Sequence, residues 1–303
     1  MKKLTEYEPE RRFTIAEDGF HGTYYKPEVN KYPDKVLILF GGSAGKFLLS
    51  EMCAEKYYEN GLNVIAVAYR DVPGAPSQLH GIPLELIEKA ILWGKENVGN
   101  KVIVNGISLG GQLALLLGSY FPDLVSGVVA INPMHFSQQG MKSFKALEFT
   151  PNACFTLRGE DLPYYPVSVS TKEFQKQLKK DARKSHEFMN CAEFYRREIK
   201  LMDNDAPYMI PVEKSKAAIL LLSGGQDVML PSQEICEKVV ERLEKYHYSY
   251  PYKHLYYEIA SHYLCPAKPL TAKLFRIERK EAKKCDLSRK QALEDTLKFI
   301  EEI

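Results

Sequence analysis

Five short stretches of the chain are almost continuously apolar and rich in valine, isoleucine and leucine. Polar residues do not alternate with apolar ones within them, as they would in a strand with one face in water. Continuous apolar runs of this length favour strands buried on both faces of a parallel sheet. The predicted strands are KVLILF (35–40), NVIAVAY (63–69), KVIVNG (101–106), VSGVVAIN (125–132) and AAILLLSG (217–224).

Segments with helical periodicity separate these runs. In IPLELIEKAILWGKENVG, Leu84, Ile87 and Ile91 fall on one face, and Pro83 stands near the predicted start. Alternating strand and helix predicts an α/β fold, with a mostly parallel twisted sheet flanked by helices and joined by right-handed crossovers. Further helices are predicted in SEMCAEKYYENG, SLGGQLALLLGSYFP, PSQEICEKVVERLEKY and LSRKQALEDTLKFIEE, the last opening at Ser288 with capping-box spacing to Gln291.

One region interrupts this alternation. The stretch between VSGVVAIN and AAILLLSG is too long for a connecting loop. Its part 171–203 has helical periodicity and many charges, whereas 136–169 looks irregular. We therefore predict one domain over 1–303, with an inserted helical lid at 136–214 over one end of the sheet. Residues 1–34 are predicted to form a short antiparallel lead-in that contains a strand in FHGTYYKP.

Composition and charge narrow the class of protein. A chain of 303 residues buries a large core without disulfides or metals, and the formal charge of +2 does not indicate a nucleic-acid partner. The six cysteines are scattered without metal-ligand spacing, which fits a reducing compartment. Neither a signal peptide nor a membrane-spanning run is recognisable. These features predict a cytoplasmic protein without a membrane span.

The segment Gly106-Ile-Ser108-Leu-Gly110 fits the pattern G-x-S-x-G. The pattern alone is weakly specific, but here it follows a predicted buried strand and opens a predicted helix. That setting is the one that a nucleophile elbow requires, because the turn exposes the serine oxygen above the sheet. Glycines two residues away relieve the crowding of this strained turn. The alternative is an ordinary serine that caps a helix.

A nucleophilic serine needs a base and an acid that orients the base. In α/β hydrolases these follow the serine in the order acid, then histidine, at strand ends. Asp227 follows the predicted strand AAILLLSG, and His262 follows the run that reads as the last strand. His135 also follows a strand and is a candidate for the pocket lining, but it precedes the acid. The predicted triad is Ser108, Asp227 and His262.

Backbone N–H groups complete the predicted chemistry by stabilising an oxyanion. One donor is expected from Leu109, the residue after the nucleophile. The other is expected from the loop after KVLILF, which reads FGGSAG, where Gly42 and Ser43 are both well placed. Glycines at this point let the backbone approach a reacting carbonyl.

The stretches LILFGGSAG, GLNVIAVAY, NGISLGGQLAL, IPVEKSKAAILLLSGGQD and YEIASHYLCP together resemble the C-terminal domain of acyl-CoA thioesterases and bile-acid-CoA:amino-acid N-acyltransferases. The resemblance runs from about Lys35 to Leu270 and implies an α/β-hydrolase fold. By position it implies that Ser108 is the nucleophile, Asp227 the acid and His262 the base. The conjugating transferases have a cysteine as nucleophile, so the serine favours hydrolysis. Many members have glycine before the histidine, where this chain has Ser261.

The expected function is that of a serine acyl hydrolase without a metal or redox cofactor, acting on a small-molecule acyl thioester or ester. The resemblance favours an acyl-CoA thioesterase. A carboxylesterase or acyltransferase without CoA specificity, and a non-catalytic binding protein, are the alternatives. Lys179, Lys180 and Arg183 in the lid are candidate contacts for CoA phosphates, although interleaved acids also fit a solvated helix with ordinary ion pairs.

Overall fold

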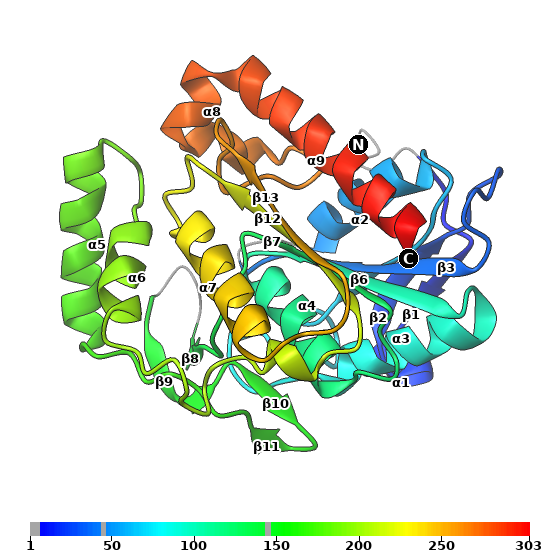
Figure 1. The fold of residues 1–303 in the computed structure, drawn as a ribbon, viewed down its shortest axis with the longest axis horizontal. Helices are drawn as coiled ribbons and strands as arrows, with labels where there is room; N and C mark the ends of the chain where they lie inside the picture. The colour runs from blue at the N-terminus through cyan, green and yellow to red at the C-terminus, as the bar shows by residue number, and fades with distance from the viewer. Residues whose placement is uncertain (1–6, 44–46, 143–146) are drawn as a thin grey trace.

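The computed structural model describes residues 7–43, 47–142 and 147–303. Within them, eight strands form one twisted sheet in the order β1-β2-β4-β3-β6-β7-β12-β13 (Figure 1). In this order the last six strands, β4, β3, β6, β7, β12 and β13, run parallel to one another. At the other edge β2 is antiparallel both to β4 and to β1. Their bounds are β1 Arg11–Phe13, β2 His21–Tyr25, β3 Lys35–Phe40, β4 Asn63–Ala68, β6 Lys101–Ile107, β7 Gly127–Ile131, β12 Ala218–Gly224 and β13 Tyr252–Tyr257.

Helices cover both faces of this sheet because its central strands are apolar on both sides. Every residue of β3, β4 and β7 is buried. Apolar side chains of α3, α4 and α7 pack on one face, and those of α2 and α9 pack on the other. These helices are α2 Phe47–Tyr58, α3 Glu85–Asn97, α4 Leu109–Tyr120, α7 Ser232–Lys245 and α9 Ala282–Glu302. Shorter pieces are α1 Ile15–Asp18, α8 Arg276–Lys280 and the 3₁₀ turns η1 Val212–Lys214 and η2 Leu270–Leu274.

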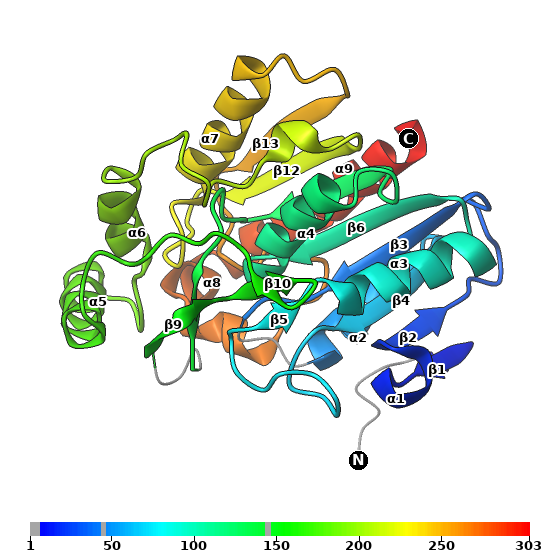
Figure 2. The ribbon, with the colours of Figure 1, turned by 90° about the horizontal axis from the view of Figure 1, so that it is seen from below.

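Residues 136–214, the lid, leave the main sheet after β7 and return to it at β12. The helices α5 (Thr171–Ser185) and α6 (Ala192–Ile199) stand at the end of the molecule away from β1 and β2 (Figure 2). The apolar side chains of the lid form one core together with Met229, Leu230 and Phe275, and in this core the rings of Phe174 and Phe194 lie 4.5 Å apart. The lid is joined to the loop before α7, because the N–H groups of Cys191 and Ala192 donate to the carbonyl of Val228 at 2.9 and 3.0 Å.

Two parts of the sequence prediction need correction. The stretch 136–169, expected to be irregular, contains four short strands, β8 to β11. β8 pairs with β9, and β10 pairs with β11 and with β5 from before α3. The predicted start of the last helix is also wrong, since α9 begins at Ala282 and the Ser288 hydroxyl instead donates to the carbonyl of Ile259 at 2.8 Å. The short strands are β5 Ile82–Pro83, β8 Gln139–Met141, β9 Phe149–Ala153, β10 Phe155–Leu157 and β11 Glu160–Asp161.

The described part of the chain holds no helix that is both long enough and apolar enough to cross a bilayer.

Candidate active site

Ser108 lies on a sharp turn between β6 and α4, at the carboxyl end of the central strand. Its backbone has φ 60° and ψ −120°, a strained conformation for a residue with a Cβ atom. A Cβ at Gly106 would collide with the carbonyl of Gly110, and a Cβ at Gly110 would collide with the carbonyl of Gly41, which explains both glycines of the motif. The Ser108 hydroxyl forms no capping bond with α4. The alternative of an ordinary helix-capping serine therefore does not describe this residue.

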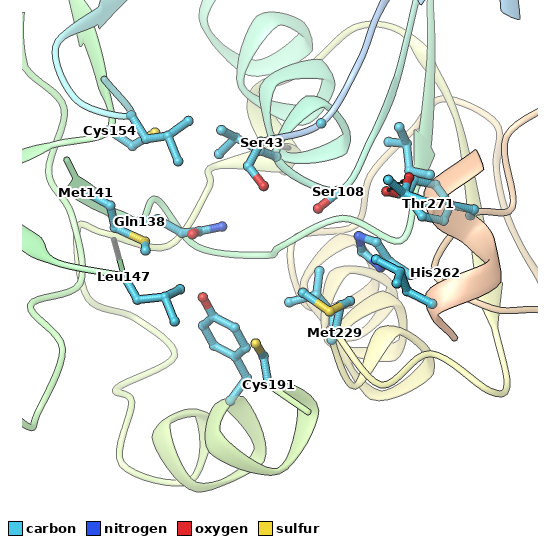
Figure 3. A pocket seen from close by; sticks show the side chains of 18 of the residues that line it. Ser43, Ser108, Gln138, Met141, Leu147, Cys154, Cys191, Met229, His262 and Thr271 are labelled. Atoms are coloured by element: carbon cyan, nitrogen blue, oxygen red, sulfur yellow. Dashed lines mark hydrogen bonds between the residues drawn. The ribbon is translucent and has the colours of Figure 1, made fainter. Parts of the chain in front are cut away.

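The two other predicted triad residues meet at the same end of the sheet. Asp227 lies in the loop after β12, and His262 lies in the loop after β13. The His262 Nδ1 and the Asp227 Oδ2 are 2.8 Å apart, and both side chains are buried. Figure 3 shows the imidazole ring beside the Ser108 hydroxyl. The parallel sheet thus brings the serine and the histidine together in space, although more than 150 residues separate them in the sequence.

The carboxylate of Asp227 is held in one orientation by its own loop. Its Oδ1 accepts hydrogen bonds from the N–H groups of Met229 at 2.7 Å and Leu230 at 3.1 Å. Its Oδ2 accepts from the hydroxyl of Ser232 as well as from His262. The two backbone donors fix which oxygen faces the ring. Asp227 is therefore placed to hold His262 with a proton on Nδ1 and with Nε2 free to accept one.

A buried ion pair supports the loop that carries His262. Ser261 donates its hydroxyl to Glu278 at 2.6 Å, and Glu278 pairs with Arg289 at 2.6 Å. Arg289 also donates to the carbonyl of Tyr263 at 3.1 Å. The side chains of Glu278 and Arg289 are almost completely buried. This arrangement gives a physical reason for a serine at position 261, because a glycine there would leave Glu278 without one of its donors.

Asn132 joins the two loops that carry the acid and the histidine. It is fully buried at the end of β7 with a positive φ of 45°. Its Nδ2 donates to the carbonyl of His262 at 2.9 Å, and its Oδ1 accepts from the N–H of Gly224 at 2.9 Å. Our sequence analysis missed this residue. Its one signal was an amide side chain directly after a buried strand.

The loop after β3 runs beside Ser108. A Cβ built on Gly42 would lie 3.1 Å from the Cβ of Ser108, so the backbone here approaches the serine closely. The Tyr69 hydroxyl donates to the carbonyl of Gly41 at 3.0 Å, and the Arg70 guanidinium donates to the carbonyl of Ser43. Burial raises the pKa of Tyr69, which keeps its hydroxyl a neutral donor. Sequence analysis missed both, because nothing in the run NVIAVAYR marks a contact with a loop 28 residues away.

A cavity of about 190 Å³ opens at Ser108 and His262 between the sheet and the lid. Polar side chains at its wall include Ser43 and Gln138, which Figure 3 shows pointing toward the space beside Ser108. Most of the wall is apolar, which suits a hydrocarbon chain. The apolar lining consists of Leu49, Leu79, Ile107, Leu109, Met141, Leu147, Phe174, Phe188, Met229, Leu230, Leu274 and Phe275, together with Cys154, Cys191, Tyr195 and Tyr263.

Two thiols in this wall are poor competitors for Ser108 as a nucleophile. Cys154 and Cys191 are both buried and free. Burial raises the pKa of each thiol to about 12, so each remains protonated at neutral pH. Because the thiolate is the reactive form, neither side chain is activated for attack.

The remaining predicted binding residues lie away from this cavity. His135 is buried and lines a separate cavity bordered by Lys238 and Arg242. Burial, with a smaller contribution from the Lys238 charge, lowers the His135 pKa to about 3, so its ring is neutral. The placement of His135 therefore differs from the predicted pocket lining. Lys179, Lys180 and Arg183 are exposed on α5, which contributes Phe174 to the catalytic cavity.

The sheet order and the placement of Ser108, Asp227 and His262 at the carboxyl ends of its strands are those of an α/β hydrolase. Solved structures with this fold include a dienelactone hydrolase homologue from Klebsiella pneumoniae subsp. pneumoniae MGH 78578, with a TM-score of 0.55, 13% identity and coverage of 94% of this chain and 93% of that one. A carbohydrate esterase from gut microbiota has a TM-score of 0.54, 13% identity and coverage of 99% and 97%.

Residues 82–281 match the model of the family described as BAAT / Acyl-CoA thioester hydrolase C terminal, and the chain belongs to this family. Mouse acyl-coenzyme A thioesterase 3 is 26% identical over 86% of this chain and 54% of its own length. Mouse bile acid-CoA:amino acid N-acyltransferase is 24% identical over 78% of this chain and 50% of its own length. The chain thus spans about half the length of the curated relatives it matches.

Proposed function

We propose that this protein is a serine acyl hydrolase that cleaves acyl-CoA thioesters through an acyl-serine intermediate. The observation that carries the proposal is the position of Ser108. It stands on a strained turn beside a histidine that an aspartate orients, in the wall of an apolar cavity. Family membership supports the choice of thioester, because named relatives are acyl-CoA thioesterases.

The proposed mechanism uses only groups of this chain. His262 accepts the proton of Ser108 at Nε2 while the serine oxygen attacks the acyl carbonyl. Asp227 stabilises the imidazolium through the Nδ1 bond. His262 then gives this proton to the departing thiolate, or to an alkoxide if the substrate is an ester. His262 then accepts a proton from water as this water attacks the acyl-serine. The ring returns that proton to the Ser108 oxygen as the bond between this oxygen and the acyl carbon breaks, which releases a carboxylic acid and restores the serine hydroxyl.

The oxyanion is proposed to rest on the N–H groups of Leu109 and Gly42. Leu109 is the first residue of α4, so the partial positive charge at the start of this helix strengthens the attraction of its N–H for an oxyanion. In a planar trans peptide the carbonyl and the following N–H point in opposite directions. Because Tyr69 holds the Gly41 carbonyl, it also fixes the direction of the Gly42 N–H away from Tyr69. This favours Gly42 over Ser43 as the second donor.

Tyr69→Phe is expected to lower kcat by about 10- to 100-fold with little change in KM. An oxyanion donor is worth roughly 10²–10³ in rate, and this change disorders the donor without removing it. The measurement is steady-state kinetics together with the Kd of a boronate that mimics the tetrahedral intermediate, which should rise in parallel with the loss in kcat.

Tyr248→Phe is the matched control, because its hydroxyl also donates to a backbone carbonyl, that of Ala217 at 2.6 Å, far from Ser108. Both variants should lose a similar small amount of stability, about 1 kcal/mol. Equal kinetics in the two variants would show that Tyr69 only supports the fold.

An ester hydrolase without CoA specificity is the second candidate. One observation favours it: among the described residues, the cavity wall contains neither lysine nor arginine to meet a phosphate. The phosphates of a CoA substrate would therefore have to contact lysine or arginine side chains outside the cavity. The cations Lys172, Lys176, Lys179 and Arg183 repeat along one exposed face of α5, and no ion pair is seen for them in the part of the chain described.

The test compares an acyl-CoA series with neutral esters of the same acyl groups, each at low and high salt. If α5 holds CoA phosphates, KM for the acyl-CoA should rise about threefold or more with salt, because exposed ion pairs are each worth roughly 0.2–1 kcal/mol and are screened. KM for the ester should stay constant. Charge reversal of Lys179, Lys180 and Arg183 should reproduce the rise at low salt. Equal responses of both substrates would favour the ester hydrolase.

A further inference from the structure

Three large apolar side chains are exposed on the segments that carry Phe188 and Leu274 of the cavity wall. Phe188, in the loop after α5, is 45% exposed, and Leu274 of η2 is 47% exposed. Both also line the cavity, so the apolar surface continues from the inside to the outside. Leu270, one turn before Leu274, is 87% exposed. We call Phe188, Leu270 and Leu274 the apolar rim.

The rim is one surface, because its two sides contact each other. The rings of Phe188 and Phe275 lie 5.1 Å apart in an edge-to-face arrangement. The N–H of Arg276 donates to the carboxylate of Glu187 at 3.0 Å. Arg279 donates to the carbonyls of Lys273 and Leu274 at 2.8 and 2.7 Å, which fixes η2 in its exposed position. The exposure of Leu270 and Leu274 thus belongs to a hydrogen-bonded turn.

The segment that carries Leu270 and Leu274 is rich in positive charge. Residues 268–290 contain nine lysines and arginines and three acidic residues. All three acids are in ion pairs: Glu278 with Arg289, Glu281 with Lys284, and Asp286 with Lys268. Lys273, Arg276 and Lys280 make no ion pair with any residue that the structure describes. Free cations beside exposed apolar side chains are the composition of surfaces that bind anionic lipid.

We propose that the apolar rim and its cations dock the protein on the surface of an anionic lipid bilayer, with the opening of the cavity facing the lipid. Leu270, Leu274 and Phe188 would enter the boundary between headgroups and acyl chains. Lys273, Arg276 and Lys280 would lie at the level of the lipid phosphates. The continuity of the rim with the cavity wall would let an acyl chain pass between lipid and cavity along apolar surface. The docking itself does not depend on turnover.

The test measures binding of the full chain to unilamellar vesicles by flotation, in a Ser108→Ala background so that hydrolysis plays no part. Vesicles of phosphatidylglycerol mixed with phosphatidylcholine are compared with vesicles of phosphatidylcholine alone. We expect binding to the anionic vesicles that is at least tenfold stronger and that weakens with salt, because each cation near such a surface contributes about fivefold.

The decisive variant combines Leu270→Asn with Lys273→Glu, two changes three residues apart on η2. It should lower the partition coefficient at least tenfold. The matched control combines Val29→Asn with Lys26→Glu, since Val29 is 72% exposed and Lys26 is exposed three residues before it. This control lies between β2 and β3, at the end of the sheet opposite Ser108, and should bind as the parent does. Circular dichroism checks that both variants are folded.

Three results would overturn the proposal: equal binding to the two kinds of vesicle, parental binding by the η2 variant, or an equal loss in the control. Self-association of the parent without lipid, abolished by the η2 variant in sedimentation, would instead assign the rim to a second copy of the chain. Because the background lacks the Ser108 hydroxyl, none of these outcomes bears on the proposed hydrolysis.

Discussion

Ser108→Ala is expected to abolish hydrolysis of every acyl substrate, lowering kcat by about 10⁶-fold, the cost of losing the nucleophile in serine hydrolases. Substrate binding should survive, because the cavity wall is unchanged. Stability should also survive, since the Ser108 hydroxyl makes no capping bond that alanine would lose. The measurements are steady-state kinetics, a binding assay with an acyl-CoA, and thermal unfolding.

Ser119→Ala is the matched control in the same helix. Its hydroxyl donates to the carbonyl of Leu115 at 2.7 Å within the core, so its loss should affect stability slightly and activity very little. If Ser108→Ala kept more than about a thousandth of the activity, another group would be the nucleophile. Cys154 and Cys191 in the cavity wall would then be tested by substitution to serine.

Asp227→Asn is expected to lower kcat by about 10⁴-fold while leaving the fold intact. The N–H groups of Met229 and Leu230 both donate to Oδ1, so the amide oxygen of asparagine must take that place. Its NH₂ group then faces His262 Nδ1 and forces the ring proton onto Nε2. In that tautomer the imidazole cannot accept a proton from Ser108.

Ser232→Ala separates this tautomer effect from a general loosening of the loop. It removes a neighbouring bond to the same Asp227 oxygen but leaves the contact with His262. A much smaller loss in kcat is expected than for Asp227→Asn. Comparable losses in the two variants would mean that Asp227 acts by holding its loop and not by setting the tautomer. Imidazole nitrogen chemical shifts report the tautomer directly.

The strands of the central sheet were predictable because burial on both faces leaves a continuous apolar run. KVLILF became β3 with the same bounds, and the other four runs differ from the observed strands by one or two residues at an end. The short strands of the lid were missed for a physical reason. β10 pairs with β5, which lies more than 70 residues earlier, and β8, β10 and β11 have only two or three residues, too few to show periodicity.

The meeting of Ser108, Asp227 and His262 could be predicted because Ser108 directly follows β6 and the other two lie in the loops after β12 and β13. A parallel sheet brings such positions together at one edge. The supporting residues could not be predicted. Tyr69, Asn132 and Ser232 act through single hydrogen bonds to backbone or carboxylate oxygens, and such bonds leave no pattern in a sequence. The approach of the loop with Gly42 and Ser43 to Ser108 could be predicted from strand order, whereas our proposal of Gly42 as the donor rests on the contact of Tyr69 with Gly41.

The hydrogen bonds between the lid and Val228 restrict the motion of the lid relative to the sheet. Val228 is the residue after Asp227, and its carbonyl holds the start of α6 through the N–H groups of Cys191 and Ala192. A conformer in which the lid swings away must either break both bonds or pull the acid loop with it. Open conformers of this kind would carry a displaced aspartate, so they would form a catalytically silent part of the ensemble. If the lid moves as one body, lid opening and the position of Asp227 are coupled through these two bonds.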